Sequence, residues 1–140
     1  MEIKMSAVIL VFSSVGKLAL QLRSKTDDSY PSHWDFSAAG GLDFGEEHGV
    51  AASRELYEEI GIKSDLTFVF ETTFKDNFCE DKLFVYKTIS DGPFFPDPKE
   101  VDDIQFFSKQ EIDVMIESGS KFHPEFIFLW KEKLQEEFSS

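Results

Sequence analysis

Cysteine is nearly absent from this sequence of 140 residues, in which Cys79 stands alone. One cysteine cannot form a disulfide within the chain, so a cytoplasmic location is expected. The apolar run at 7–12 has no cleavage-site pattern and is far shorter than the ~20 residues that span a membrane, so it predicts a strand. No internal repeat or low-complexity linker divides the chain, and its length is typical of a single domain over residues 1–140.

Basic residues are also scarce, with 14 Lys and Arg against 27 Asp and Glu and a formal net charge of −13. This charge argues against a nucleic-acid backbone or an anionic membrane as the main partner. An anionic substrate would need metal ions and a few local bases to offset the repulsion. Hydrophobic residues make up 41% of the chain, with 16 phenylalanines, which is enough for a sizeable core.

Strand and helix patterns alternate along the chain. Strands are predicted at 5–12, 17–23, 66–74, 82–90 and 100–107, with a short extended piece at 33–36. Helices are predicted at 50–60, from a Ser108 cap to about 117, and at 124–138. This alternation predicts an α/β/α sandwich with a mixed β-sheet.

Three acids share one face of the first predicted helix. Glu55, Glu58 and Glu59 stand at i, i+3 and i+4, and Arg54 is the one base on this helix. Stacked carboxylates repel one another at neutral pH, and a hard divalent cation bound by oxygen ligands would relieve that repulsion. A solvated acidic face is the alternative reading of the helix alone.

The residues opposite the acidic face and just before the helix support a site that packs against a hydrophobic core. The apolar residues expected to pack on the sheet are Val50, Ala52, Leu56, Tyr57 and Ile60. Just ahead of the helix, Gly40, Gly41 and Gly45 predict a loop that bends tightly and approaches a ligand closely.

The stretch 40–62 resembles the Nudix box, G-x5-E-x7-R-E-U-x-E-E-x-G-U with U apolar, at every fixed position. The matching residues are Gly40, Glu46, Arg54, Glu55, Leu56, Glu58, Glu59, Gly61 and Ile62. The approach WDFSAAGG most resembles the branch that includes isopentenyl-diphosphate isomerases and their hydrolase relatives. One departure is Ala39, which stands where many Nudix hydrolases have the first glycine of Pro-Gly-Gly.

The resemblance implies a Nudix-type α/β/α sandwich and hydrolysis of a nucleoside diphosphate linked to another moiety, X. It implies that Glu55 and Glu59 ligate Mg²⁺, or Mn²⁺ in its place, with Glu58 as a ligand or a base. The Gly40 carbonyl would complete the shell, and Arg54 would orient the glutamates. These residues form the catalytic and metal-binding set that the resemblance predicts.

Further candidates lie outside this central set. Glu46 would pair with the box arginine, join a second metal or contact substrate. Glu100, which stands before a predicted strand, would add a ligand or a base, with Asp102 and Asp103 as neighbouring candidates. A plain acidic turn is the alternative there.

The predicted substrate contacts are Arg23 and Lys25, at a strand end that borders the cleft in the resemblance, together with Gly41 and Glu46. A solvated strand end is the alternative reading for the two bases. The loops at 26–32 and 91–98 would shape the choice among small-molecule nucleotide diphosphates.

Two other functions stay open. Isomerases of this branch need a cysteine before the box and a histidine-rich metal site, whereas this chain has no cysteine before Cys79 and only His33 and His48 near the box. A non-catalytic binding module is opposed by the intact glutamates of the box. The helix at 124–138 could complete the core or form a homodimer interface.

Overall fold

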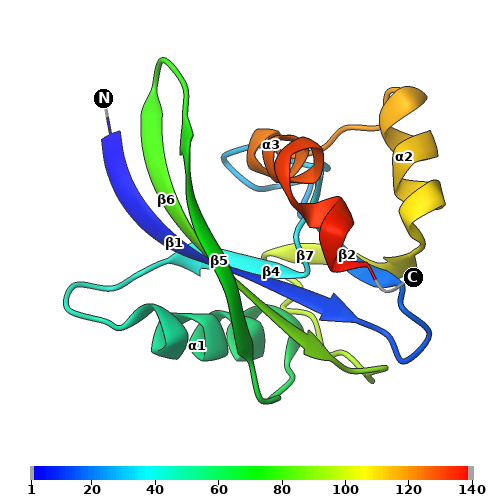
Figure 1. Ribbon diagram of the computed structural model, residues 1–140, viewed down its shortest axis with the longest axis horizontal. Coiled ribbons are helices and arrows are strands. Elements are labelled where there is room, and N and C mark those ends of the chain that lie inside the picture. Colours follow the sequence, from blue (N-terminus) through cyan, green and yellow to red (C-terminus); the bar gives the residue numbers. More distant parts are fainter. Residues whose placement is uncertain (1, 139–140) are drawn as a thin grey trace.

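A computed structural model describes residues 2–138 as one mixed β-sheet with helices on both faces (Figure 1). The strands are β1 (Glu2–Phe12), β2 (Leu18–Arg23), β3 (Trp34–Asp35), β4 (Ala38–Gly41), β5 (Thr67–Lys75), β6 (Cys79–Ile89) and β7 (Val101–Phe107). The helices are α1 (His48–Ile60), α2 (Lys109–Glu117), α3 (Pro124–Glu132) and the 3₁₀ turn η1 (Leu134–Glu137).

The central strand of the sheet is β1. It runs parallel to β6 along its whole length, and its other edge pairs antiparallel with β4 and with the start of β2. On the outer edges, β5 pairs with β6, while β3 and β7 pair with β2. The predicted mixed sheet is therefore confirmed, with β1 and β6 as its parallel pair.

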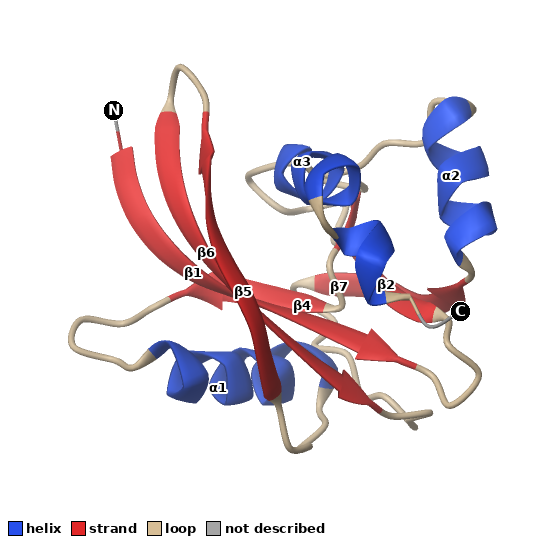
Figure 2. Ribbon diagram, viewed as in Figure 1, coloured by secondary structure: helices blue, strands red, loops and turns tan. Residues whose placement is uncertain are grey.

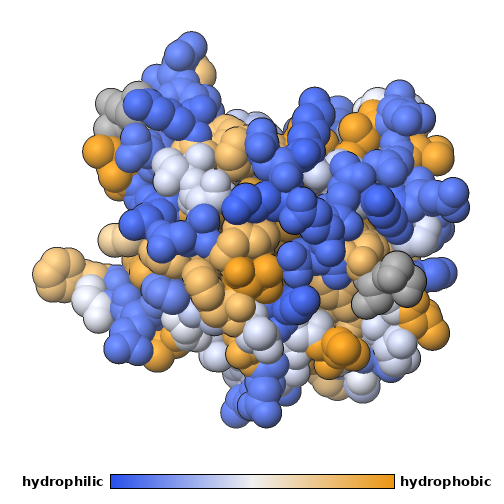
Figure 3. Space-filling model, in the orientation of Figure 1, coloured by the Kyte–Doolittle hydropathy of each residue, from blue (hydrophilic) through white to orange (hydrophobic). Residues whose placement is uncertain are grey.

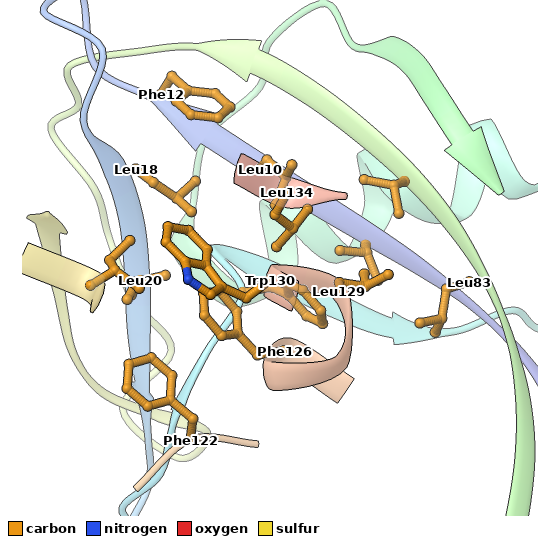
Figure 4. Packing of buried hydrophobic residues seen from close by; sticks show 14 residues of the cluster. Leu10, Phe12, Leu18, Leu20, Leu83, Phe122, Phe126, Leu129, Trp130 and Leu134 are labelled. Carbon is orange, nitrogen blue, oxygen red and sulfur yellow. The ribbon is translucent and has the colours of Figure 1, made fainter. Parts of the chain in front are cut away.

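Alternate residues of β1 pack into two hydrophobic cores on opposite faces of the sheet. Leu10 belongs to a buried cluster with Phe126 and Trp130 on the face covered by α3 (Figure 4). Its neighbour Ile9 belongs to a second cluster with Leu56 of α1 on the other face. Figure 2 shows the resulting layers, with α1 on one side of the strands and α2 and α3 on the other. Burial on both faces explains the unbroken apolar run in β1.

Helix starts follow the signals in the sequence. The Ser108 hydroxyl accepts a hydrogen bond from the Glu111 N–H, and the Glu111 carboxylate accepts one from the Ser108 N–H, which confirms the predicted capping box. Pro124 occupies the first turn of α3, where its missing N–H costs no helical hydrogen bond.

Two predicted boundaries are wrong. Gly40 and Gly41 do not form a loop but end strand β4, paired in register with Ala7 and Ser6 of β1. The predicted helix at 124–138 ends at Glu132, because the backbone leaves helical geometry at the next residue before the short 3₁₀ turn.

The predicted apolar arc of α1 is partly wrong. Val50 and Tyr57 are each more than half exposed. Ala51 and Glu59 lie on the buried side instead, because the helix is rotated so that one of its acids faces inward.

The remaining surface is strongly polar. Hydrophilic residues cover much of the face in view, with apolar residues scattered among them (Figure 3), in keeping with the net charge of −13. Within residues 2–138, no helix is both long and apolar enough to cross a membrane.

Candidate active site

A cavity of about 390 Å³ brings together side chains from both faces of the fold. Its α1 side is defined here by Gly40, Gly41, Glu55, Glu59 and Glu100, and its α3 side by Lys4, Ser6, Asp81, His123 and Glu125. The two sides adjoin at β4, where Gly40 faces Glu55 of α1 and the next residue, Gly41, is the register partner of Ser6. The volume is within the usual range for a small-molecule site, roughly 300–1,000 Å³.

On the α1 side, one guanidinium holds three carboxylates. Arg54 donates from Nε and Nη2 to the two oxygens of Glu46, both at 2.9 Å. Its Nη1 donates to Glu55 at 2.9 Å and to Glu58 at 3.2 Å, and Nη2 also donates to the Gly41 carbonyl. The hydrogen bonds from Arg54 lower the pKa of Glu46 to about 2. Arg54 therefore fixes acids of the helix and the preceding loop around one point.

The third helical acid is held differently. Glu59 is only 7% exposed, and its Oε1 accepts hydrogen bonds from Gln21 Nε2 at 2.7 Å and from the Ala39 N–H at 3.1 Å. Burial, followed by the neighbouring Glu55 carboxyl, raises the pKa of Glu59 well above its ordinary value. A cation beside Glu55 and Glu59 would offset both the cost of burying a charged Glu59 and its repulsion by Glu55.

Gly40 is where β4 touches α1. A Cβ placed on Gly40 would overlap the carboxyl group of Glu55, so this carboxyl lies directly against the glycine backbone. By contrast, a Cβ on Gly41 would meet nothing nearer than the Met5 carbonyl at 3.9 Å. Glycine at 40 therefore makes room for the Glu55 carboxylate, a role that differs from the predicted freedom to bend.

The α3 side contains acids that face each other. The Ser6 hydroxyl donates to both oxygens of the buried Asp81, at 2.9 and 3.0 Å. Glu125, in the first turn of α3, lies beside Asp81, and its pKa rises to about 9, mainly through burial and then through Asp81. Sequence reasoning missed this pair. The available signal was Ser6, a polar residue within an otherwise apolar strand.

Comparison with known proteins identifies the architecture around this cavity. Residues 3–130 match the family model described as the NUDIX domain. The chain belongs to the Nudix family. An uncharacterized Nudix hydrolase of Listeria monocytogenes is 34% identical over 128 residues, which cover 89% of this chain and 75% of the relative.

Solved structures share the same Nudix fold. The DR0079 protein of Deinococcus radiodurans superposes with a TM-score of 0.82 at 18% identity, covering 94% of this chain and 83% of its own. A MutT protein of Methanosarcina mazei gives a TM-score of 0.80 at 16% identity, covering 96% of this chain and 95% of its own. Nudix hydrolases generally act on nucleoside diphosphate derivatives and use divalent metals.

The donor set on the α1 side fits such a metal. Glu55, Glu59 and Glu100 offer carboxylate oxygens, which Mg²⁺ and Mn²⁺ prefer. Burial raises the pKa of Glu100, and the carboxylates of Asp97, Glu55 and Glu58 raise it further. Within residues 2–138, no three His, Cys, Asp or Glu side chains already form a convergent metal cluster. Ligation by Glu55 and Glu58 would use the oxygen of each carboxylate that does not accept a hydrogen bond from Arg54, namely Oε2 of Glu55 and Oε1 of Glu58.

Some of the predicted substrate contacts line the cavity, and others lie outside it. Arg23 and Gly41 line the cavity, but the Arg23 guanidinium is already paired with Asp35 at 3.0 Å and Asp27 at 3.1 Å. Lys25 is exposed outside the cavity lining, and its N–H bonds to Asp102. Glu46 likewise lies outside the lining, paired with the box arginine.

Proposed function

We propose that this Nudix protein hydrolyses the diphosphate linkage of a nucleoside diphosphate joined to a further group, X, with Mg²⁺ or Mn²⁺ bound on the α1 side of the cavity. The observation that carries the proposal is a pair of carboxylates in one cavity wall, Glu55 against the Gly40 backbone and Glu59 hydrogen-bonded to the Ala39 N–H. Family membership supports the reaction class, and the oxygen donors support the type of metal.

In this proposal, Glu55, Glu59 and the Gly40 carbonyl hold the main cation, with Glu58 and Glu100 available beside them. A divalent cation bound there supplies neutralisation of the diphosphate oxygens and a lowered pKa of bound water.

Arg54 orients Glu55 and Glu58 through the hydrogen bonds described above. Glu58, whose side chain is about half exposed, and Glu100, whose pKa is raised, are the carboxylates assigned to accept the proton of the attacking water.

The substrate must bind in a cavity dominated by acids. Since Arg23 is occupied by internal ion pairs, the cation carries most of the neutralisation of the diphosphate. We assign the diphosphate to the α1 side and the remainder of the substrate to the adjoining α3 side, where Lys4 and His123 stand among the acids.

The lone thiol supports hydrolysis over isomerisation. Cys79 lies at the start of β6 outside the cavity lining, and burial raises the pKa of its thiol. A raised pKa lowers the fraction of thiolate, which is the reactive form.

The test is a substrate screen with Mg²⁺ and chromatographic detection of products. The panel contains nucleotide sugars, dinucleoside polyphosphates, oxidised nucleoside triphosphates, dinucleotide cofactors and isopentenyl diphosphate. Glu59→Gln and Glu58→Gln are compared with Glu47→Gln, which makes the same charge change on an exposed residue outside the cavity lining.

The proposal predicts cleavage at the diphosphate by the wild type and by Glu47→Gln, with kcat/KM at least about a hundredfold lower in Glu59→Gln. Equal turnover by all variants would remove the glutamates from the mechanism. Rearrangement of isopentenyl diphosphate without cleavage would establish an isomerase. Binding of a nucleotide without turnover would establish a binding module.

A further inference from the structure

Gln21 is a buried amide in β2, only 6% exposed, between residues that serve the two hydrophobic cores. Its side chain points to the same face as Ala19, toward α1, whereas Leu20 belongs to the core on the α3 face. Strand alternation accounts for this orientation. A polar residue here needs hydrogen-bond partners, because leaving a buried amide unpaired costs about 1–3 kcal/mol.

The partners of Gln21 are specific. Its Nε2 donates to the Ser37 carbonyl at 3.2 Å and to Glu59 Oε1 at 2.7 Å. A primary amide has two N–H groups, so both donors are accounted for by these bonds. One bond anchors the amide to the backbone that leads into β4, and the other extends to the acid of α1.

The same oxygen of Glu59 receives a second donor. The Ala39 N–H bonds to Oε1 at 3.1 Å, so both Gln21 and Ala39 act on Oε1 and neither acts on Oε2. The terminal torsion of a glutamate is intrinsically broad, so a free carboxylate would present either oxygen in many orientations. Two convergent N–H donors restrict this rotation and leave Oε2 directed away from them.

We propose that Gln21 is a positioning residue of the metal site, which holds Oε1 of Glu59 so that Oε2 is presented to the cation. This inference rests on the proposed function, because it requires a divalent cation at Glu59. Gln21 lies outside the Nudix box, on a strand more than thirty residues before Glu59. Substitution of a group that hydrogen-bonds to a metal ligand typically lowers metal affinity by about 10- to 100-fold.

The experiment measures Mn²⁺ binding to the metal-free protein by titration calorimetry, with no substrate present. Gln21→Met keeps the approximate length of the side chain but removes both donors. Gln21→Asn keeps the amide but withdraws it by one methylene. Ser37→Ala is the matched control, since the Ser37 hydroxyl is buried nearby and bonds Val11 and Ala19 but not Glu59.

We expect Gln21→Met and Gln21→Asn to bind Mn²⁺ about tenfold or more weakly than the wild type, and Ser37→Ala to bind it normally. Thermal unfolding without metal separates this effect from a general loss of stability. A lower melting temperature in Gln21→Met with unchanged Mn²⁺ affinity would reduce Gln21 to a structural role and leave the proposed function standing. Failure of the wild type to bind Mn²⁺ would overturn both proposals.

A measurement on the unmodified protein covers the case in which the Gln21 variants do not fold. The side-chain amide resonances of Gln21 are followed by NMR during a titration with Mg²⁺. The inference predicts that these resonances shift together with binding at Glu59. Resonances that stay fixed while Mg²⁺ binds would contradict it.

Discussion

The acids on the two sides of the cavity differ in the hydrogen-bond donors that surround them. On the α1 side, Arg54 donates to Glu55 and Glu58, and the amides of Gln21 and Ala39 converge on one oxygen of Glu59. On the α3 side, Ser6 donates to Asp81, and Glu125 lies beside Asp81 with its pKa raised to about 9, mainly by burial. Burial and a neighbouring carboxyl raise the pKa of Glu59 as well, so the difference lies in the donors that orient the α1-side acids, and it is on this side that we propose the cation binds.

Among the tests of this comparison, the largest expected effect comes from removing the base that organises the α1 side. Arg54→Met leaves Glu46, Glu55 and Glu58 without their shared donor. We expect kcat/KM for the diphosphate substrate to fall by about 10- to 100-fold and the free energy of unfolding to fall by about 2 kcal/mol. Steady-state kinetics and denaturant unfolding measure the two effects. A kcat/KM equal to that of the wild type in Arg54→Met would show that the glutamates need no orienting base.

The second test displaces one carboxylate without changing any charge. Gly40→Ala places a methyl group where the Glu55 carboxyl lies, whereas Gly41→Ala adds the same group where there is space. We expect Gly40→Ala to lower kcat/KM and Mn²⁺ affinity by about tenfold at a nearly unchanged melting temperature. Gly41→Ala serves as the control for the metal site and should retain the Mn²⁺ affinity. Equal behaviour of the two variants would contradict the close packing of Glu55 on Gly40.

These two glycines also show how much of the site can be predicted from the sequence. The Nudix box predicts which acids gather and that Gly40 matters, and strand and helix patterns predict the layers. The pattern does not reveal that Gly40 and Gly41 belong to a strand, because glycine is disfavoured in strands and the pairing with β1 is a long-range contact. Glycine is tolerated here because the Glu55 carboxyl occupies the space beside Gly40.

The third test concerns the proton on the α3 side. Burial, followed by Asp81 and Asp35, raises the folded pKa of Glu125 from an ordinary 4.5 to about 9, with Lys4 opposing the shift. The folded state therefore keeps a proton that the unfolded state loses, so stability falls as pH rises from about 4.5 to 9. One such proton corresponds to a slope of about 1.4 kcal/mol per pH unit.

Glu125→Gln should flatten this slope, and denaturant unfolding of both proteins at a series of pH values measures it. Glu136→Gln, on the exposed part of η1, provides a matched charge control. A wild-type slope that persists in Glu125→Gln would show that the proton is held elsewhere.

The smallest expected effect is on the acid limb of stability. The pKa of Glu46 is lowered to about 2, so its ion pair with Arg54 contributes above pH 4.5 and is lost as pH falls from there toward 2. Glu46→Gln should lower the melting temperature slightly above pH 4.5, where the ion pair is present, and make the melting temperature less sensitive to pH between 4.5 and 2. Differential scanning calorimetry from pH 2 to 8 measures the difference. An unchanged pH dependence of the melting temperature below pH 4.5 would show that other acids account for the loss of stability.

The arrangement of acids on the α3 side could not be predicted from the sequence. Asp81 and Glu125 lie 44 positions apart, on β6 and α3, and neither belongs to a recognisable motif. Their contact depends on how α3 packs on the sheet through Phe126 and Leu129, which only the three-dimensional fold specifies. Strand alternation is enough to place Gln21 on the face of β2 opposite Leu20, but its partner Glu59 is distant in sequence and could not be predicted, for the same reason.

One measurement tests the difference between the two sides most directly, namely anomalous diffraction from crystals soaked with Mn²⁺ near pH 7. The account predicts a manganese peak on the α1 side, within ligating distance of Glu55 and Glu59, together with loss of that peak in Glu59→Gln crystals. A peak between Asp81 and Glu125 would contradict the assignment of the cation to the α1 side, and persistence of the α1-side peak in Glu59→Gln crystals would contradict the role of Glu59 as a ligand.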